Sequence, residues 1–214
     1  MEVLKAADIK AFLTNMAKLM QEKKDELTEL DSVIGDGDLG LTMSKGFAKV
    51  AETVGELDEA DVGTILMKSG MAMAAAVPST MGTLMATGLM RGGKAVQGKE
   101  EIGLPELAEL MQAFVNGIMT RGKAKVGDKT ILDSLYPAAE ALKTAVKSGK
   151  TLAEGVSVAY QEAVAGLEAT REMVSQHGKA ACFQEKTRGK QDPGATVGMY
   201  LLKALAETVQ QTSG

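Results

Sequence analysis

The sequence predicts an all-α protein, and two of its features carry that prediction. The 214 residues include 14 methionines but only four phenylalanines, three tyrosines and no tryptophan, a composition that favours helices over sheets. Apolar residues recur at helical spacing along most of the chain, without the alternation of strands and helices that a parallel sheet requires. Because 45% of the residues are hydrophobic, the chain can form a proper core. We expect residues 1–214 to fold as one domain, a compact bundle of about eight helices.

Eight segments carry the helical period. In the first, apolar residues from Ile9 to Met20 follow Asp8, which we expect to cap the helix, and the pattern ends near Leu30. The other segments cover residues 43–55, 61–77, 81–90, 105–119, 131–146, 151–174 and 196–209. Two connections differ from the short turns between the rest: the acidic turn at residues 31–40 and the stretch at residues 178–194. Long or chemically unusual loops on a helical scaffold are where functional sites concentrate.

Composition excludes several classes of function. The net charge of −4 offers no basic surface for general nucleic-acid binding. The most apolar stretch, residues 71–89, is interrupted by Pro78 and by glycines, so we interpret it as core and expect no membrane span. Cys182 has no second cysteine with which to form a disulfide, and the first residues lack an apolar segment behind a basic start. The expected compartment is therefore the cytoplasm.

The acidic turn is the clearest candidate site. Asp31, Asp36 and Asp38 lie within eight residues, among glycines that permit tight turns. Carboxylates crowded in this way repel one another unless a cation binds them, and hard cations such as Mg²⁺ prefer oxygen ligands. The spacing does not fit a calcium-binding EF-hand, because no Glu closes a twelve-residue loop. The alternative is a solvated acidic turn between two helices.

Two phosphate-binding motifs match by letter only. Residues 35–40 satisfy the dinucleotide pattern G-x-G-x-x-G, but the residues inside the pattern include aspartates, and a helix precedes them instead of a strand. Residues 88–94 resemble a Walker A fragment, but Ala95 follows where Ser or Thr would hold magnesium. We reject both motifs and interpret the second as a helix end.

Three helix entrances carry groups that suit a phosphate ligand. They are the segments 79–83, 127–133 and 191–196, which are rich in Gly, Ser, Thr and Asp. The free N–H groups and the dipole at a helix start attract anions, although ordinary capping explains each segment equally well. Their recurrence beside an acidic loop favours a site for a magnesium-bound nucleotide.

The same segments resemble the nucleotide-binding subunit of dihydroxyacetone kinases, the DhaL or DAK2-type family. Its motifs are an Asp followed by G-D-G-D-H-G, then R-G-K-A-x-x-G-D-K-T, and later H-Q-D-P-G-A-T. They correspond to Asp31 with residues 35–40, to residues 121–130 and to residues 190–196. Their order and spacing match across nearly the whole chain.

The resemblance implies an antiparallel eight-helix barrel that binds ADP or ATP and two Mg²⁺ ions at one end. It assigns the metals to Asp31, Asp36 and Asp38. It assigns the nucleotide to Leu39, Gly40, Leu41, Thr42, Thr80, Met81, Gly82, Gly122, Thr130, Ile131, Lys179, Asp192, Pro193 and Gly194, with Gly122 and Ile131 beside the adenine. These residues position the reactants, and none is expected to act as a covalent catalyst. The implied partners are a ketone-binding (DhaK-like) subunit and a phosphotransferase phosphodonor (DhaM-like) protein.

The chain departs from the family pattern at three of these positions. Leu39 replaces the motif histidine, Thr42 replaces the usual asparagine, and Lys179 replaces an arginine that would grip phosphate in two places. Because an aliphatic side chain donates no hydrogen bond, we expect Leu39 to weaken the hold on nucleotide and to speed its exchange. Two alternatives stay open: a kinase subunit for a different sugar or ketone, and a non-catalytic subunit that senses nucleotide.

His177 and Cys182 are each the only residue of their type. His177 has no neighbour at metal-ligand spacing, so we interpret it as an ordinary loop residue. Cys182 lies beside Phe183, and we expect a half-buried apolar side chain without a role in covalent chemistry.

Overall fold

The computed structural model describes residues 2–211 and confirms the all-α class. Within those residues it contains nine α-helices, two 3₁₀ segments and one two-stranded ribbon. The helices are α1 (Ala6–Glu22), α2 (Lys24–Ile34), α3 (Leu39–Glu56), α4 (Val62–Ala76), α5 (Thr80–Ala95), α6 (Leu104–Gly122), α7 (Leu132–Lys147), α8 (Leu152–Ala169) and α9 (Pro193–Gln211). The 3₁₀ segments are η1 (Thr170–Glu172) and η2 (Lys179–Thr187), and β1 (Leu4–Lys5) pairs antiparallel with β2 (Glu101–Ile102).

The first helical segment of the sequence divides into two helices at Lys23. Met20 and Leu27, on either side of the break, are both fully buried, so the apolar pattern runs through it without a gap. The cap also differs from the expectation. Lys5 is the N-cap residue of α1, and Asp8 lies in the first turn, where its Oδ2 accepts the N–H of Lys5 at 2.8 Å. Asp8 thus satisfies a backbone donor at the helix start from position N3 instead of the N-cap.

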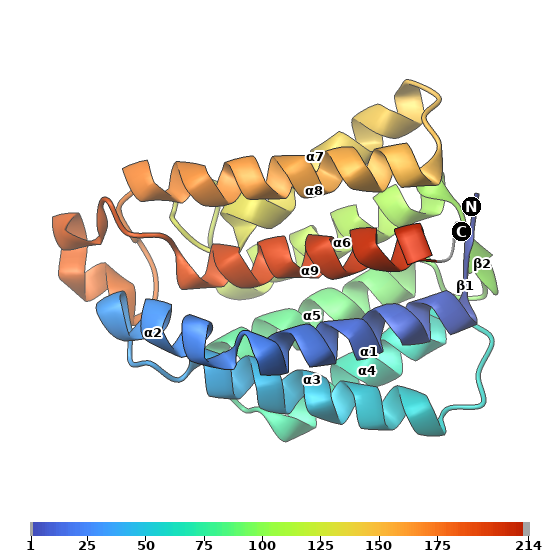
Figure 1. The fold of residues 1–214 in the computed structure, drawn as a ribbon, viewed down its shortest axis with the longest axis horizontal. Coiled ribbons are helices and arrows are strands. Elements are labelled where there is room, and N and C mark those ends of the chain that lie inside the picture. Colours follow the sequence, from blue (N-terminus) through green and yellow to red (C-terminus); the bar gives the residue numbers. More distant parts are fainter. Residues whose placement is uncertain (1, 212–214) are drawn as a thin grey trace.

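The long helices form a closed antiparallel barrel (Figure 1). From α3 to α9 each helix packs against its successor, α1 packs on α3, and α9 also packs against α1, which closes the ring. The short α2 packs on α3 and α9. Because successive long helices run in opposite directions, the connections at residues 35–38, 77–79, 123–131 and 170–192 lie at one end of the barrel, and the β1–β2 ribbon lies at the other (Figure 1).

Glycines allow α5 to approach both α4 and α6 closely. A Cβ atom added to Gly63 would lie 2.5 Å from the carbonyl oxygen of Gly93, and one added to Gly88 would lie 2.7 Å from the ring of Phe114 on α6. Gly88 and Gly93 are the glycines of the Walker A-like fragment. They lie inside α5, so their sequence pattern reflects helix packing, in agreement with the rejection of that motif.

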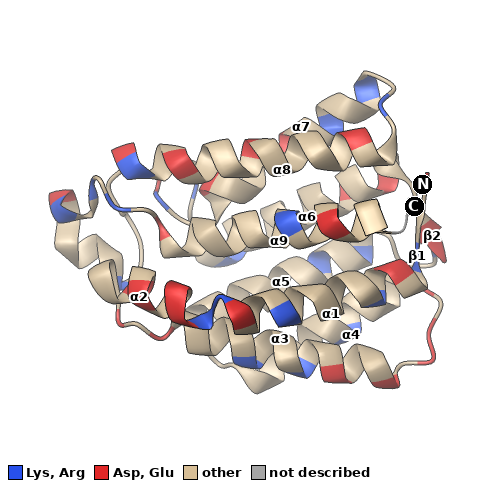
Figure 2. Ribbon diagram, viewed as in Figure 1, with Lys and Arg blue, Asp and Glu red and all other residues tan. Residues whose placement is uncertain are grey.

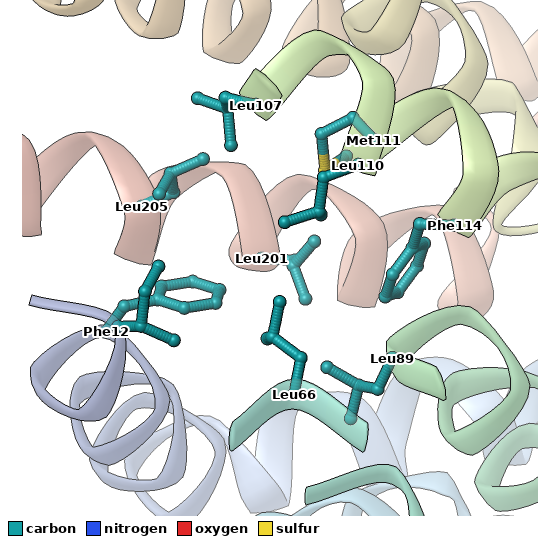
Figure 3. Close-up of a pocket in the computed structure, with 10 residues that line it drawn as sticks. Phe12, Leu66, Leu89, Leu107, Leu110, Met111, Phe114, Leu201 and Leu205 are labelled. Carbon is teal, nitrogen blue, oxygen red and sulfur yellow. The ribbon is translucent and has the colours of Figure 1, made fainter. Parts of the chain in front are cut away.

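Aliphatic side chains, methionines and phenylalanines fill the barrel, as the composition predicts. Side chains from five helices enclose a gap of about 30 Å³, and Figure 3 shows them pointing toward one another. They are Ile9 and Phe12 of α1, Leu66 of α4, Leu89 of α5, Leu107, Leu110, Met111 and Phe114 of α6, and Leu201 and Leu205 of α9. Between residues 2 and 211, no helix is both long enough and apolar enough to span a membrane.

Candidate functional site

The three aspartates of the acidic turn come together where α2 gives way to α3. Asp31 belongs to the last turn of α2, and its Oδ2 accepts the N–H groups of Asp38 at 3.0 Å and Leu39 at 3.2 Å. One carboxylate oxygen from each of Asp31, Asp36 and Asp38 lies within 4.8 Å of the others. A cluster of this size and composition matches the oxygen ligands that Mg²⁺ prefers.

The glycines of the turn are required by its geometry. Gly37 has φ = +75°, a left-handed conformation that side chains other than glycine rarely adopt. Gly35 lies so close to the end of α2 that a Cβ atom there would be 2.2 Å from Oδ1 of Asp31. The glycines that match a dinucleotide motif therefore form a tight turn between two helices, and this turn brings three carboxylates together.

The pKa values of Asp36 and Asp38 shift in opposite directions. Burial raises the pKa of the Asp38 carboxyl, and the negative charges of Asp36 and Asp31 raise it further. Lys179 of η2 forms an ion pair with Asp36, and this contact lowers the pKa of Asp36 and raises that of the lysine. Figure 2 shows the acidic turn between α2 and α3 at the barrel end. The turn thus carries concentrated negative charge with one lysine held against it.

The predicted nucleotide residues of α5, α6, α7 and α9 also meet at this end. A Cβ atom on Gly194 would lie 3.1 Å from Cε of Met81 and 3.2 Å from the backbone nitrogen of Ile131. One on Gly122 would lie 3.3 Å from Leu84, one turn into α5. Residues of α5, α6 and α9 and the residue before α7 therefore come together at the same end of the barrel as the acidic turn.

The starts of α3 and α5 differ in what they can offer an anion. In α5 the N–H of Gly82 donates to Oγ of Ser79 at 3.0 Å, whereas Thr80 and Met81 lie in the first turn, where N–H groups have no partner within the helix. In α3 the N–H of Leu39 is bonded to Asp31, which leaves the N–H groups of Gly40 and Leu41 as the candidate donors.

Leu39 and the residues that follow it differ in how far their side chains are buried. Its side chain is 6% exposed and belongs to the hydrophobic core. The side chains of the next residues differ in exposure, since Leu41 is 57% exposed and Thr42 is buried. The expectation that Leu39 weakens the hold on nucleotide stays a prediction.

The D-P-G-A-T motif starts α9. Asp192 is buried, its Oδ2 accepts the N–H of Ala195 at 2.7 Å, and Pro193 is the first helical residue. This is an N-cap followed by the residue type preferred at N1. Burial raises the pKa of Asp192 to about 7, although hydrogen bonding and Lys129 oppose the shift. The Asp192 carboxyl therefore caps the helix, and Gly194 lies against Met81 and Ile131.

Lys129 is a buried residue that sequence reasoning missed. It is 2% exposed and adopts φ = +59°. Its Nζ donates to the carbonyl oxygens of Thr170 and Lys190, the latter at 2.5 Å, and burial lowers its pKa. Lys129 thereby ties the 123–131 connection to both ends of the 170–192 connection. Thr130, beside it, is half-buried, and its N–H donates to Asp133 at 2.7 Å.

His177 has a partner that its sequence neighbours do not reveal. Its Nε2 lies 2.8 Å from Oδ2 of Asp128, 49 residues away. Burial alone would raise the pKa of Asp128, but the N–H of Lys125 and the contact with His177 together lower it. Cys182 is exposed, so the expectation that it is half-buried is wrong, because η2 lies against α2 at the barrel end with residues 182–186 exposed.

Kinases and kinase subunits are similar to this chain in sequence. The profile of the DAK2 domain family matches residues 33–207. The ADP-binding subunit DhaL of the PEP-dependent dihydroxyacetone kinase of Escherichia coli (strain K12) is 32% identical over 203 residues, which cover 95% of this chain and 97% of the relative. The L-erythrulose 1-kinase of Mycolicibacterium smegmatis is 30% identical over 206 residues, which cover 94% of this chain and 35% of that enzyme.

Solved structures share the fold. The dihydroxyacetone kinase of C. freundii matches with a TM-score of 0.75 and 24% identity over 94% of this chain, which spans 34% of that chain. A structure of the same kinase in complex with AMP-PNP and Mg²⁺ matches with a TM-score of 0.70. The expected phosphotransferase class is confirmed at the level of the family, since these relatives are kinases or kinase subunits. Together, the match over residues 33–207 and the high coverage of DhaL show that the chain belongs to the DAK2 domain family.

Proposed function

We propose that this chain is the nucleotide-binding subunit of a kinase for dihydroxyacetone or a related short ketose, and that it holds ADP or ATP with Mg²⁺ at the acidic end of the barrel. The observation that carries the proposal is the cluster of Asp31, Asp36 and Asp38 within 4.8 Å, next to the helix starts of α3 and α5. The names of the relatives, an ADP-binding subunit and an erythrulose kinase, support it.

The residues fit a magnesium-bound phosphate group. Mg²⁺ in nucleotide sites is held by a few carboxylates together with water and phosphate oxygens, and three carboxylates suffice for the two ions that we propose. The N–H groups of Gly40, Leu41, Thr80 and Met81 are the proposed donors to phosphate oxygens. Adenine would lie beside Gly122 and Ile131, where the starts of α7 and α9 approach the end of α6.

Lys179 is proposed to act as an exchangeable cation. Its ammonium group pairs with Asp36, one of the proposed metal ligands, and its side chain is 66% exposed. Mg²⁺ and the lysine therefore compete for the same carboxylate, and a bound phosphate gives the displaced lysine a new anionic partner. When bound, Mg²⁺ would supply the charge that stabilises phosphoryl transfer.

The acceptor and the phosphodonor belong to other proteins in this proposal. We expect a DhaK-like subunit to hold the ketone, and ADP to be rephosphorylated in place by a DhaM-like protein or replaced by ATP. The expected compartment is the cytoplasm. Mass spectrometry of small molecules released from protein that was purified without added nucleotide would identify the resident nucleotide.

Calorimetric titration of ADP with and without Mg²⁺ tests the proposal. We expect Asp38→Asn to weaken ADP binding about tenfold or more in the presence of Mg²⁺, which corresponds to 1.4 kcal/mol, and to change little in its absence. Asp58→Asn removes an equal charge from an exposed site at the opposite end of the barrel and should leave both titrations unchanged. Equal ADP affinity of wild type and Asp38→Asn in Mg²⁺ would refute the metal site.

Lys179→Met provides a second test, because it should change the affinity for Mg²⁺ alone and the affinity for ADP with Mg²⁺ in opposite directions. Removing the ammonium frees Asp36, so Mg²⁺ alone should bind severalfold more tightly, whereas ADP with Mg²⁺ should bind about tenfold more weakly because a phosphate partner is lost. Titrations of MgCl₂ and of ADP into the same variant measure both effects. If both affinities change in the same direction, Lys179 does not exchange between the two partners.

A further inference from the structure

A basic groove runs along the outside of the barrel between α5 and α6. Its volume is about 1070 Å³, and it is lined from both helices, with Ala74 of α4 at one edge. Four cationic side chains line it: Arg91 and Lys94 of α5, Arg121 of α6 and Lys123 directly after α6. The groove is therefore much larger than the gap inside the barrel and differs from it in chemistry.

Within residues 2–211 the four cations form no ion pair with an acidic side chain. None of the side chains that line the groove is a carboxylate, and none of the ion pairs formed within residues 2–211 includes Arg91, Lys94, Arg121 or Lys123. Lys94 makes one neutral contact, to Oε1 of Gln97 at 2.8 Å. The nearest acidic residue on α6, Glu109, lies one turn beyond the lining residue Ala113. The groove thus presents positive charge that an anionic partner can neutralise.

Small and apolar side chains form much of the floor of the groove. Gly117 is buried there, and a Cβ atom on it would lie 2.9 Å from Cγ of Arg91, so the arginine stem crosses the floor at a glycine. Alanine, threonine and methionine side chains line much of the rest. The volume lies at the upper limit of typical small-molecule sites, about 300 to 1,000 Å³, and grooves with apolar floors are surfaces that accept peptide segments.

We propose that this groove docks an acidic segment of a partner protein, whose carboxylates pair with Arg91 and Lys94 in the half of the groove farther from the acidic turn. Lys94 lies 14 residues after the start of α5, about 20 Å along the helix axis at 1.5 Å per residue. This docking site is therefore separate from the proposed nucleotide site, and the inference goes beyond the proposed function.

A nucleic acid is a poorer occupant than a protein segment. The chain carries a net charge of −4, which opposes a phosphate backbone at long range. Single-stranded nucleic acids gain affinity by stacking on aromatic side chains, and no aromatic side chain is among those that line the groove. Carboxylates spaced along a peptide need only the local cations and the apolar floor.

Fluorescence anisotropy of a labelled peptide of alternating glutamate and alanine tests the proposal on the full chain. We expect the wild type to bind it, with an affinity that falls as salt rises. The double variant Arg91→Glu/Lys94→Glu should bind about tenfold more weakly or worse. The matched control Lys18→Glu/Lys147→Glu makes the same change of net charge on α1 and α7, where both lysines are exposed, and should bind like wild type.

A second variant leaves every cation in place. Asn116→Asp adds one carboxylate to the groove wall with almost no change of shape, and its repulsion should weaken peptide binding severalfold while ADP binding stays unchanged. Three results would each overturn the proposal: no peptide binding by wild type, equal losses in the groove variant and the matched control, or tighter binding of a labelled single-stranded oligodeoxynucleotide than of the peptide. Because ADP binding is measured separately, failure here is distinguishable from failure of the proposed nucleotide site.

Discussion

Asp192 is a buried carboxyl that folding places close to other buried charged groups. It is 5% exposed, and burial raises its pKa from 3.8 to about 7. The N–H of Ala195 and the ammonium group of Lys129 favour the charged form, whereas Asp133 opposes it. The N-cap of α9 is therefore secured by a carboxyl whose charge is unfavourable at neutral pH.

This burial predicts a pH dependence of stability. A carboxyl whose pKa is higher in the folded than in the unfolded protein binds more protons in the folded state, so its contribution to the free energy of unfolding falls as pH rises from about 4 to about 7. Asp192→Asn keeps a cap acceptor but does not ionise. We expect this variant to be less stable than wild type at pH 4. Between pH 4 and pH 8 the difference in the free energy of unfolding should shift in favour of the variant by about 1 to 3 kcal/mol.

Urea unfolding at a series of pH values measures the difference between Asp192→Asn and wild type. Using the difference removes the contributions of carboxyl groups that do not interact with Asp192, whereas Asp133, whose pKa burial also raises, remains coupled to it. Asp58→Asn serves as the control and should show no comparable trend. A difference that is constant from pH 4 to pH 8 would mean that Asp192 ionises in the folded protein as it does in water.

At the scale of the helices, close approach depends on residues without side chains. Gly88 of α5 lies against Phe114 of α6, which is 2% exposed, and an added Cβ atom would lie 2.7 Å from two ring carbons. Helix propensity alone would favour alanine over glycine by about 1 kcal/mol. We expect packing to override that preference here, because the buried ring of Phe114 would have to shift to accommodate the added methyl group.

Gly88→Ala is therefore expected to lower the free energy of unfolding by about 1 to 2 kcal/mol, as overpacking of about 1 to 3 kcal/mol exceeds the gain in propensity. Gly55→Ala is the matched control, since Gly55 lies in α3 with no atom within 4 Å of an added Cβ atom. It should be neutral or slightly stabilising. Thermal and urea unfolding followed by circular dichroism compare the two, and a stabilised Gly88→Ala would contradict the packing argument.

At the scale of the whole molecule, α9 closes the barrel and also holds α2. The hydroxyl of Tyr200 on α9 donates to Oε1 of Glu26 on α2 at 2.5 Å, and Nζ of Lys23 lies 5.6 Å from the centre of the tyrosine ring. Burial and the bond to Glu26 raise the pKa of Tyr200 to about 12. α2 ends at the acidic turn, so this contact links ring closure to the candidate site.

Tyr200→Phe removes that hydrogen bond while keeping the ring. We expect a loss of about 1 kcal/mol in the free energy of unfolding, at the low end for bonds to charged groups because Glu26 is partly exposed and still pairs with Lys23. The control is Tyr160→Phe on α8, whose hydroxyl has no hydrogen-bond partner within residues 2–211, and it should change stability by less than about 0.5 kcal/mol. Equal effects of the two variants would show that the α2–α9 bond contributes nothing.

The sequence by itself determined the all-α class, the location of most helices and the candidate metal ligands. Helical periodicity is a local property, so helices such as those at residues 61–77 and 105–119 can be predicted without knowledge of the tertiary structure. Three aspartates within eight residues share one turn wherever that turn lies, and their clustering follows from chain connectivity. The glycines between them are likewise required by the geometry of that one turn.

Only the tertiary structure decided which residues far apart in the sequence meet. Lys179 reaches Asp36 from 143 residues away, and Asp128 reaches His177 from 49. Lys129 joins two connections at the barrel end, and the side chain of Leu39 packs in the hydrophobic core. Such contacts depend on how the ring of helices closes, and no local pattern encodes them, because a lysine, a leucine or a histidine has the same neighbours in sequence whether its side chain faces solvent, core or carboxylate.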